Sequence, residues 1–318
     1  MPGVPFQSHI PVEPRPARLR RSCLAVPGSD PKMMARAAST EADQVFLDLE
    51  DAVAPDEKKG ARAKVVEALN THDYGDKVVT VRVNDATTRY MYDDIIALVR
   101  GAAERLDCIM LPKVQDAGQM WFAENLLNQL EADLDRDVTR RIGLEVQIET
   151  GTGSVNMREI AHVTDRIETL IFGPGDYAAN QGVPQLDLGM IERDYPGHQW
   201  HYILAQIVNN ARAVGADAID GPYGDYGDPD GYRESATRAA LLGVDGKWCI
   251  HPSQIAIANE VFAPSKEQFD LAERMLSAYA DAVAAGRGAA SLDGKMIDEA
   301  SRKMAEKLSA RGRAAGLG

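Results

Sequence analysis

The stretch 144–176, LEVQIETGTGSVNMREIAHVTDRIETLIFGPGD, has the pattern of a strand, a helix and a second strand. The first apolar run ends at Glu149, and the second leads through Gly-Pro-Gly to Asp176. The two strands of such a unit run parallel, so both carboxylates fall at the same, C-terminal edge of the sheet. One acid in that position more often caps a loop or pairs with a base. Two acids in matched positions favour a site for a hard divalent cation.

Eight strand-like runs alternate with helix-like segments along the chain. The runs cover residues 22–26, 44–49, 78–83, 108–111, 142–148, 169–172, 216–219 and 246–250. Apolar residues recur at helical spacing over 123–134, 200–211 and 269–283. Strict alternation with eight strands in a chain of 318 residues predicts an α/β fold of the TIM (β/α)8 barrel type. An open doubly wound sheet is the alternative.

The composition argues against several classes of partner. The net charge is −13, from 48 acidic and 35 basic residues, which disfavours nucleic acid or an anionic membrane as the main partner. No apolar run is long enough to span a membrane. Cys23, Cys108 and Cys249 lie in apolar runs without metal-ligand spacing, so we expect buried thiols in a reducing cytoplasm. Residues 1–20, rich in proline and arginine, predict a flexible N-terminal arm.

The active site of a parallel barrel lies at the C-terminal ends of its strands. The polar residues at those ends are Ser29, Glu50, Asp51, Arg82, Asn84, Lys113, Glu149, Asp176, Asp220 and His251. Acids that face a barrel interior are unfavourable unless they are paired or bound to a metal. They outnumber the nearby bases Arg82 and Lys113, so a bound cation would balance the excess charge.

Several short motifs occur together along the chain. They are PGS (27–29), LDLEDAVAPDEK (47–58), VRVN (81–84), LPKV (111–114), IET (148–150), FGPGD (172–176), WHY (200–202), IDGPYGD (219–225), GKWCIHPSQI (246–255) and DGKMID (293–298). In this order they resemble the citrate lyase β-subunit group of the HpcH/HpaI aldolase superfamily. WHY and GPYGD are most similar to the malyl-CoA lyases within that group.

The resemblance implies a barrel that assembles as a homotrimer or homohexamer and uses Mg²⁺, or Mn²⁺ in its place. It implies a reversible Claisen reaction in which acetyl-CoA or propionyl-CoA combines with glyoxylate. The product is a 3-hydroxyacyl-CoA such as malyl-CoA or β-methylmalyl-CoA. The alternatives are a citramalyl-CoA lyase, a malyl-CoA thioesterase, and a citrate lyase β-like subunit that works only in a larger complex on an acyl-carrier protein.

The resemblance also implies roles for particular residues. Glu149 and Asp176 match the metal ligands of the family. Arg82 matches the arginine that stabilises the thioester enolate, and Gly175 joins Arg82 and Asp176 in substrate binding. An acidic pair behind the metal's water ligands corresponds to Glu50 and Asp51.

The C-terminal residues extend beyond what a barrel needs. We expect a catalytic barrel over 21–285, a hinge near Gly286 and a lid over 286–318. From the residues alone, Asp298 is a cap for the helix that follows it. The resemblance instead implies that Asp298 closes over the site of a neighbouring subunit and acts there as the catalytic base.

Three further positions have two interpretations each. Ser29 and Lys32 suit the phosphates of CoA at a helix start, or they belong to a solvated helix N-terminus. His251 is interpreted as a structural histidine rather than an acid–base catalyst, because no nearby motif requires it. Lys113 is interpreted as a charge partner rather than a Schiff-base lysine, because the acid cluster favours a metal-dependent mechanism.

Overall fold

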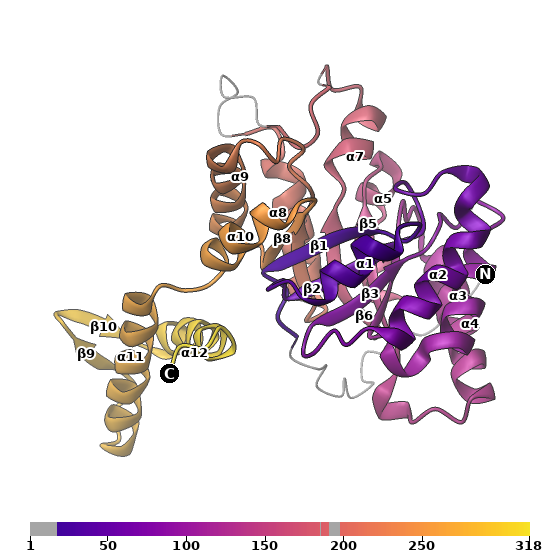
Figure 1. Cartoon of the computed structure of the whole chain (residues 1–318). Coiled ribbons are helices and arrows are strands. Elements are labelled where there is room, and N and C mark those ends of the chain that lie inside the picture. The colour runs from indigo at the N-terminus through magenta and orange to yellow at the C-terminus, as the bar shows by residue number, and fades with distance from the viewer. Residues whose placement is uncertain (1–17, 185, 191–197) are drawn as a thin grey trace, which may run out of the picture.

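The computed structural model describes residues 18–184, 186–190 and 198–318 and is organised around a closed barrel of eight parallel strands (Figure 1). The strands are β1 (Ser22–Pro27), β2 (Gln44–Asp48), β3 (Val78–Arg82), β4 (Cys108–Leu111), β5 (Gly143–Ile148), β6 (Ile167–Phe172), β7 (Asp217–Asp220) and β8 (Gly246–Cys249). Pairing of Ser22 on β1 with Lys247 on β8 closes the barrel. The predicted TIM barrel is confirmed, and the open sheet is excluded.

All eight predicted strands are present, with ends that differ by at most two residues. The surrounding helices are α1 (Pro31–Ala38), α2 (Lys58–Thr71), α3 (Met91–Ala102), α4 (Ala117–Asp133), α5 (Gly151–Val155), α6 (Met157–His162), α7 (Pro174–Gln181), α8 (His201–Ala213), α9 (Pro229–Leu241) and α10 (Ile255–Val261). Short 3-10 turns are η1 (Pro55–Glu57), η2 (Ala103–Arg105), η3 (Val138–Arg140) and η4 (Pro252–Gln254). None of the described helices is both long and apolar enough to cross a membrane.

The barrel buries two apolar layers, because successive strand residues point to opposite faces. The larger layer lies between the strands and the helices and includes Val45, Leu47 and Leu144. The smaller one fills the lumen and consists of Cys23, Phe46, Met110, Ile171, Ile219 and Trp248. All three cysteines are buried and free, as the sequence predicts.

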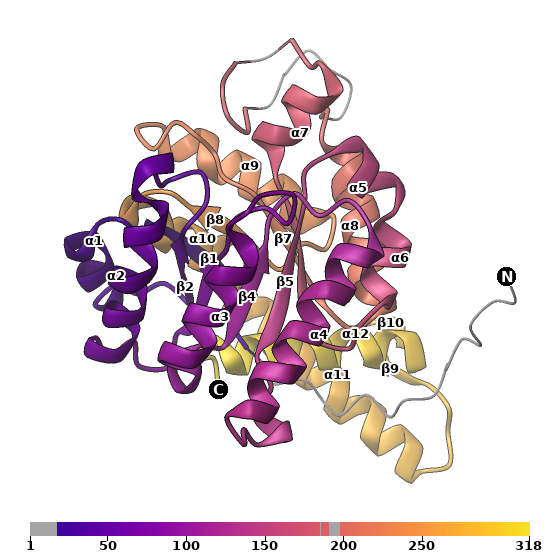
Figure 2. The same cartoon turned by 90° about the vertical axis from the view of Figure 1, so that its right-hand side faces the viewer.

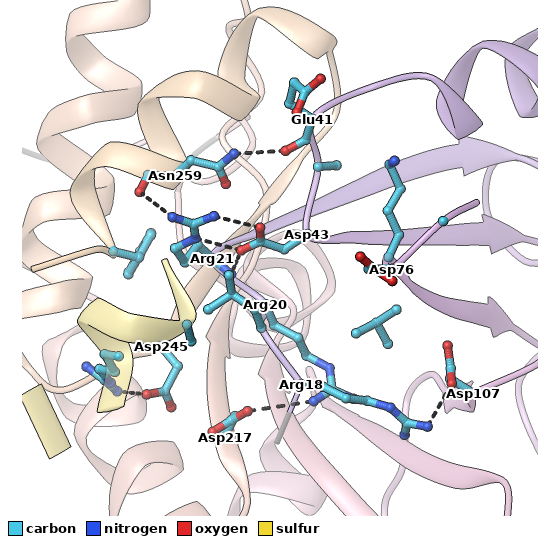
Figure 3. Close-up of a pocket in the computed structure, with 18 of the residues that line it drawn as sticks. Arg18, Arg20, Arg21, Glu41, Asp43, Asp76, Asp107, Asp217, Asp245 and Asn259 are labelled. Atoms are coloured by element: carbon cyan, nitrogen blue, oxygen red, sulfur yellow. Dashed lines mark hydrogen bonds and ion pairs between the residues drawn. The ribbon is translucent and has the colours of Figure 1, made fainter. Parts of the chain in front are cut away.

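Arginines that precede β1 close the N-terminal end of the barrel (Figure 3). Arg20 is 4% exposed and lies 3.0 Å from Glu145 on β5 and 2.6 Å from Glu168 on β6. Arg18 also contacts Glu168. Residues 1–17 of the predicted flexible arm lie outside the described residues, whereas Arg18 and Arg20 are packed into this ion network.

The chain ends in a small unit at the N-terminal end of the barrel, opposite α7 (Figures 1 and 2). It comprises α11 (Lys266–Ala284), the hairpin of β9 (Ala290–Leu292) and β10 (Lys295–Ile297), and α12 (Glu299–Ala314). Helix α11 packs mainly on α12 and β9, so the last helix in the layer around the strands is α10. The C-terminal unit therefore contains α11 as well as the residues that follow Gly286.

Candidate active site at the mouth of the barrel

The C-terminal ends of the strands bring several of the predicted acids and bases together at one mouth of the barrel. Arg82 Nη1 lies 3.3 Å from Glu50 Oε2. Lys113 Nζ lies 3.1 Å from Asp51 Oδ2 and 3.4 Å from Asp176 Oδ2, and it also contacts Glu50. These residues are distant in sequence but follow strands of one parallel barrel, which explains why they meet. With Glu149, the four carboxylates are called the mouth cluster below.

Arg82 is held in a fixed orientation at the base of this cluster. Its Nε and Nη2 donate to the two carboxylate oxygens of Asp48 at 2.8 and 2.6 Å. Its guanidinium lies 5.3 Å from the centre of the Trp248 ring, in a cation–π contact. Burial alone would lower the pKa of Arg82, but Asp48 raises it, so the side chain stays charged. Alternation along β2 identifies Asp48 as inward-facing, but the sequence does not reveal that it pairs with Arg82.

Glu149 is 1% exposed, and its carboxylate accepts two hydrogen bonds. The backbone N–H of Lys113 donates to Oε1 and Gln147 Nε2 donates to Oε2, each at 2.7 Å. Within the described residues, no lysine or arginine side chain forms an ion pair with it. Burial raises the pKa of Glu149 to about 8; the positive charges of Arg82 and Lys113 oppose the rise, and the negative charge of Asp176 adds to it. Gly173 permits this arrangement, because a Cβ there would lie 2.2 Å from Glu149 Oε2.

The mouth cluster has the donor chemistry for a divalent cation. Among the described residues, no group of three or more acids, histidines or cysteines is arranged as a ready metal site. Glu149 and Asp176 nevertheless supply two carboxylates, and Mg²⁺ usually binds through one or two carboxylates while keeping several waters. Two neutral donors and the raised pKa of Glu149 indicate a deficit of positive charge there. The residues present therefore fit the ion that the sequence predicts.

A large cavity lies at the opposite end of the barrel. Its volume is about 1010 Å³, and Figure 3 shows the charged side chains that line it. Arg21 lies 2.8 Å from Asp43, and Arg20 is paired with the buried acids described above. Because these charges pair with one another, we place the candidate site at the mouth instead.

Ser29 and Lys32 lie at the start of α1, away from contacts with the mouth cluster. The Asp30 carboxylate caps α1 and accepts the N–H groups of Lys32 and Met33 at 2.9 and 3.0 Å. The carbonyl of Ser29 accepts from Lys64 Nζ at 3.0 Å. A phosphate at this helix start would have to compete with the anionic cap for the backbone N–H groups. Ser29 and Lys32 could therefore bind a CoA phosphate only through their side chains.

Asp298 does not join the mouth cluster of its own chain. It caps α12 and accepts from the N–H and the hydroxyl of Ser301, both at 2.9 Å. This helix belongs to the unit at the N-terminal end of the barrel (Figure 2). His251 caps η4, where its ring accepts from the Ser253 N–H at 3.2 Å and stacks on Tyr226 at 4.9 Å.

Comparison with known proteins shows the class to which this barrel belongs. The HpcH/HpaI aldolase/citrate lyase family matches residues 21–252, which is most of the chain. The protein is therefore a member of this family and, by class, an enzyme of the lyase type.

Individual relatives are similar over nearly the whole chain. It is 40% identical to the L-malyl-CoA/β-methylmalyl-CoA lyase of Cereibacter sphaeroides over 304 residues, which cover 93% of this chain and 95% of that enzyme. It is 33% identical to the malyl-CoA/β-methylmalyl-CoA/citramalyl-CoA lyase of Chloroflexus aurantiacus over 94% of this chain and 89% of the relative. A crystal structure of CitE from Mycobacterium tuberculosis with magnesium, acetoacetate and coenzyme A is similar with a TM-score of 0.71 and 29% identity. That similarity covers 93% of this chain and 99% of CitE.

Proposed function

We propose that the protein is a Mg²⁺-dependent acyl-CoA lyase of the cytoplasm. It cleaves a 3-hydroxyacyl-CoA reversibly. L-malyl-CoA gives glyoxylate and acetyl-CoA, and β-methylmalyl-CoA gives glyoxylate and propionyl-CoA. The observation that carries this proposal is the mouth cluster of carboxylates around Arg82. The named activities of the most similar relatives support the same choice of substrate.

Glu149 and Asp176 are the residues that would hold the ion, and Glu50 and Asp51 would supply further negative charge to its water ligands. A bound Mg²⁺ supplies Lewis-acid polarisation of the oxo-acid carbonyl. Arg82 contributes a fixed positive charge where the thioester enolate develops, and a preoriented charge stabilises it without reorganisation. Asp48 keeps that guanidinium in place by occupying Nε and Nη2, so the N–H groups of Nη1, which lies 3.3 Å from Glu50, are the ones that would face the substrate.

Condensation also needs a base that takes a proton from the carbon next to the thioester. We assign this step to Asp298 of a neighbouring subunit, within a homotrimer or homohexamer. Asp298 caps α12, and the place of α12 at the far end of its own barrel supports action in trans (Figure 2). Residues 286–318 then act as a lid on barrel 21–285 of the neighbour, moving with α11. Gly175 in the first turn of α7, with Ser29 and Lys32, completes the proposed contacts to substrate and CoA.

Product analysis tests the reaction directly. Purified full-length protein is incubated with L-malyl-CoA and Mg²⁺, and all CoA species and glyoxylate are quantified. Equal amounts of glyoxylate and acetyl-CoA, lost with EDTA, are expected. Malate with free CoA would identify a thioesterase. No turnover of any free CoA thioester would instead indicate a subunit that requires an acyl-carrier protein. A panel of propionyl-CoA, acetyl-CoA, pyruvate and glyoxylate in the condensing direction separates citramalyl-CoA from malyl-CoA chemistry.

Subunit mixing tests the base. Asp298→Asn and Glu149→Ala proteins should each be inactive as separate preparations. After subunit exchange, part of the activity should return, because some sites combine an intact barrel with an intact lid. If exchange is demonstrated by mass or label and no activity returns, Asp298 does not act in trans.

A further inference from the structure

Lys113 holds an unusual position in the mouth cluster. It follows β4 with a φ of 50°, a left-handed backbone conformation that is uncommon for a residue with a side chain. In this conformation its backbone N–H donates to Glu149. Its side chain reaches Asp176. One residue therefore contacts both proposed metal ligands, one through its backbone and the other through its ammonium.

The Lys113 ammonium also bridges two sides of the barrel mouth. Nζ donates to Glu50 and to both oxygens of Asp51, at 3.2 and 3.1 Å, just after β2. Asp176 lies 3.4 Å away in the first turn of α7, just after β6. Because β2 and β6 face each other across the closed barrel, the ammonium draws acids from opposite walls together.

No other base takes this role in the described part of the chain. Arg82 is committed to Asp48 through two of its three nitrogens. No lysine or arginine besides Lys113 forms an ion pair with Asp51 or Asp176 among the described residues. Like charges that share a site repel, so the cluster needs a cation at its centre.

We propose that Lys113 is a built-in competitor of the metal ion. Its ammonium holds Asp176 and the acids after β2 together in the metal-free protein, and a divalent cation binds by displacing it from Asp176. This inference rests on the proposed metal site at Glu149 and Asp176. Lys113 thus keeps the mouth ordered in the metal-free protein while it weakens the affinity for the ion.

Removal of the ammonium tests the competition. In full-length Lys113→Met protein, isothermal titration calorimetry should show about tenfold tighter Mg²⁺ binding, because a repelling positive charge is gone. The melting temperature of the metal-free protein should fall by about 2–4 °C, because the carboxylates lose their counter-charge. The stabilisation gained on saturation with Mg²⁺ should therefore be larger than in the wild type.

Two control variants distinguish competition from a general effect of charge or packing. Lys64→Met removes a partly exposed ammonium on α2 that lies 3.8 Å from Glu57, and it should leave Mg²⁺ affinity unchanged. Lys113→Arg keeps the positive charge and should bind Mg²⁺ no tighter than the wild type. If Lys113→Met does not fold, Lys113→Gln serves for the same titration.

The outcomes separate this inference from the proposed function. Suppose that the wild type binds Mg²⁺ and that Glu149→Ala abolishes this binding. Unchanged or weaker Mg²⁺ binding by folded Lys113→Met protein would then overturn the competitor role alone. Equal tightening in Lys113→Arg would also overturn it. Failure of the wild type to bind Mg²⁺ at all would overturn the proposed function, and the competitor role with it.

Discussion

Glu145 lies near the start of β5, and Glu149 directly follows its last residue. Both face the inside of the barrel, but they lie at its opposite ends. Both are buried, at 0% and 1% exposure. At the N-terminal end, Glu145 pairs with Arg20 at 3.0 Å. At the mouth, Glu149 accepts hydrogen bonds from the Gln147 amide and the Lys113 backbone. The same residue type is thus matched by a buried positive charge at one end and by neutral donors at the other.

This difference separates a structural ion network from a candidate binding site. Burial raises the pKa of both carboxyls, and at Glu145 the Arg20 charge opposes the rise. At Glu149 the Arg82 charge also opposes the rise, but without an ion pair, while the Asp176 charge adds to it, and the pKa reaches about 8. An acid without a matching charge in a cleft is a candidate functional residue, whereas a paired one is usually structural. The buried acid without an ion-pair partner therefore favours the mouth as the candidate site.

The largest expected effect is on activity when the unmatched acid is neutralised. Glu149→Gln keeps the shape and one of the two hydrogen-bond-accepting oxygens but removes the negative charge of a proposed metal ligand, so kcat/KM for malyl-CoA cleavage should fall about 10⁴-fold. Thermal unfolding of the metal-free protein should shift little or upward, because an uncompensated buried charge is gone. Glyoxylate release and melting curves measure the two quantities.

The matched control is Glu145→Gln on the same strand. It leaves Arg20 with one buried carboxylate fewer, so the melting temperature should fall while the folded protein keeps its turnover. If the two substitutions lower turnover equally in stable protein, the distinction between the two ends is wrong.

The next largest effect is on stability at the N-terminal end. Arg20→Met leaves Glu145 and Glu168 buried without their shared partner, which should lower the free energy of unfolding by about 3–5 kcal/mol. Urea denaturation followed by circular dichroism measures it. Arg233→Met, which removes a surface ion pair at 2.7 Å with Glu260, should leave the urea midpoint close to that of the wild type. If Arg20→Met and Arg233→Met lower the free energy of unfolding equally, burial of the ion network does not determine its contribution to stability.

A smaller effect is expected when the charge at the mouth is kept but its geometry changes. Arg82→Lys retains the positive charge but cannot form the fork with Asp48 and also present a free N–H. Turnover should fall about 10²-fold with little change in KM, because the lost contact serves the developing enolate. An unchanged kcat with a raised KM would show that Arg82 binds the ground state instead.

The fold could be predicted because each strand has its own local signal. Apolar runs such as 78–83, each followed by a polar turn, identify the strands without knowledge of their partners. Helical spacing over 269–283 likewise predicts α11 correctly. The same spacing cannot show which surface covers a helix, and α11 packs on α12 rather than on the barrel. Periodicity reports that a face is buried, whereas the identity of its neighbour depends on tertiary packing.

The sequence predicts which residues meet at the candidate site, but not which of their side chains contact one another. Glu50, Arg82 and Glu149 meet at the mouth because parallel strand ends must share one edge. The fork between Arg82 and Asp48, and the bridge made by Lys113, depend on side-chain conformations that leave no local trace in the sequence. The same holds at the other end, where Arg18 and Arg20 read as part of a basic arm but are packed in a network with acids more than 80 residues away.

The smallest expected effect concerns the contact between α12 and the N-terminal end of the barrel. Arg311 contacts Asp245, just before β8, but its side chain is 46% exposed. Asp245 has a second partner in Arg212, at 2.7 Å, which also donates to the carbonyls of Ala216 and Gly243. Arg311→Ala should therefore lower the free energy of unfolding by no more than about 1 kcal/mol, because an exposed pair contributes little and the carboxylate keeps a base.

Arg212→Ala is the matched control for this last prediction. It removes the less exposed partner and two hydrogen bonds to backbone, so it should lower the melting temperature more than Arg311→Ala does. A larger fall for Arg212→Ala than for Arg311→Ala would show that Asp245 at the N-terminal end keeps a sufficient basic partner after one is lost. Glu149 at the mouth has no such ion-pair partner among the described residues. If Arg311→Ala instead lowers turnover strongly at an unchanged melting temperature, docking of α12 controls where Asp298 is presented. The two ends of the barrel would then be linked in function rather than separate.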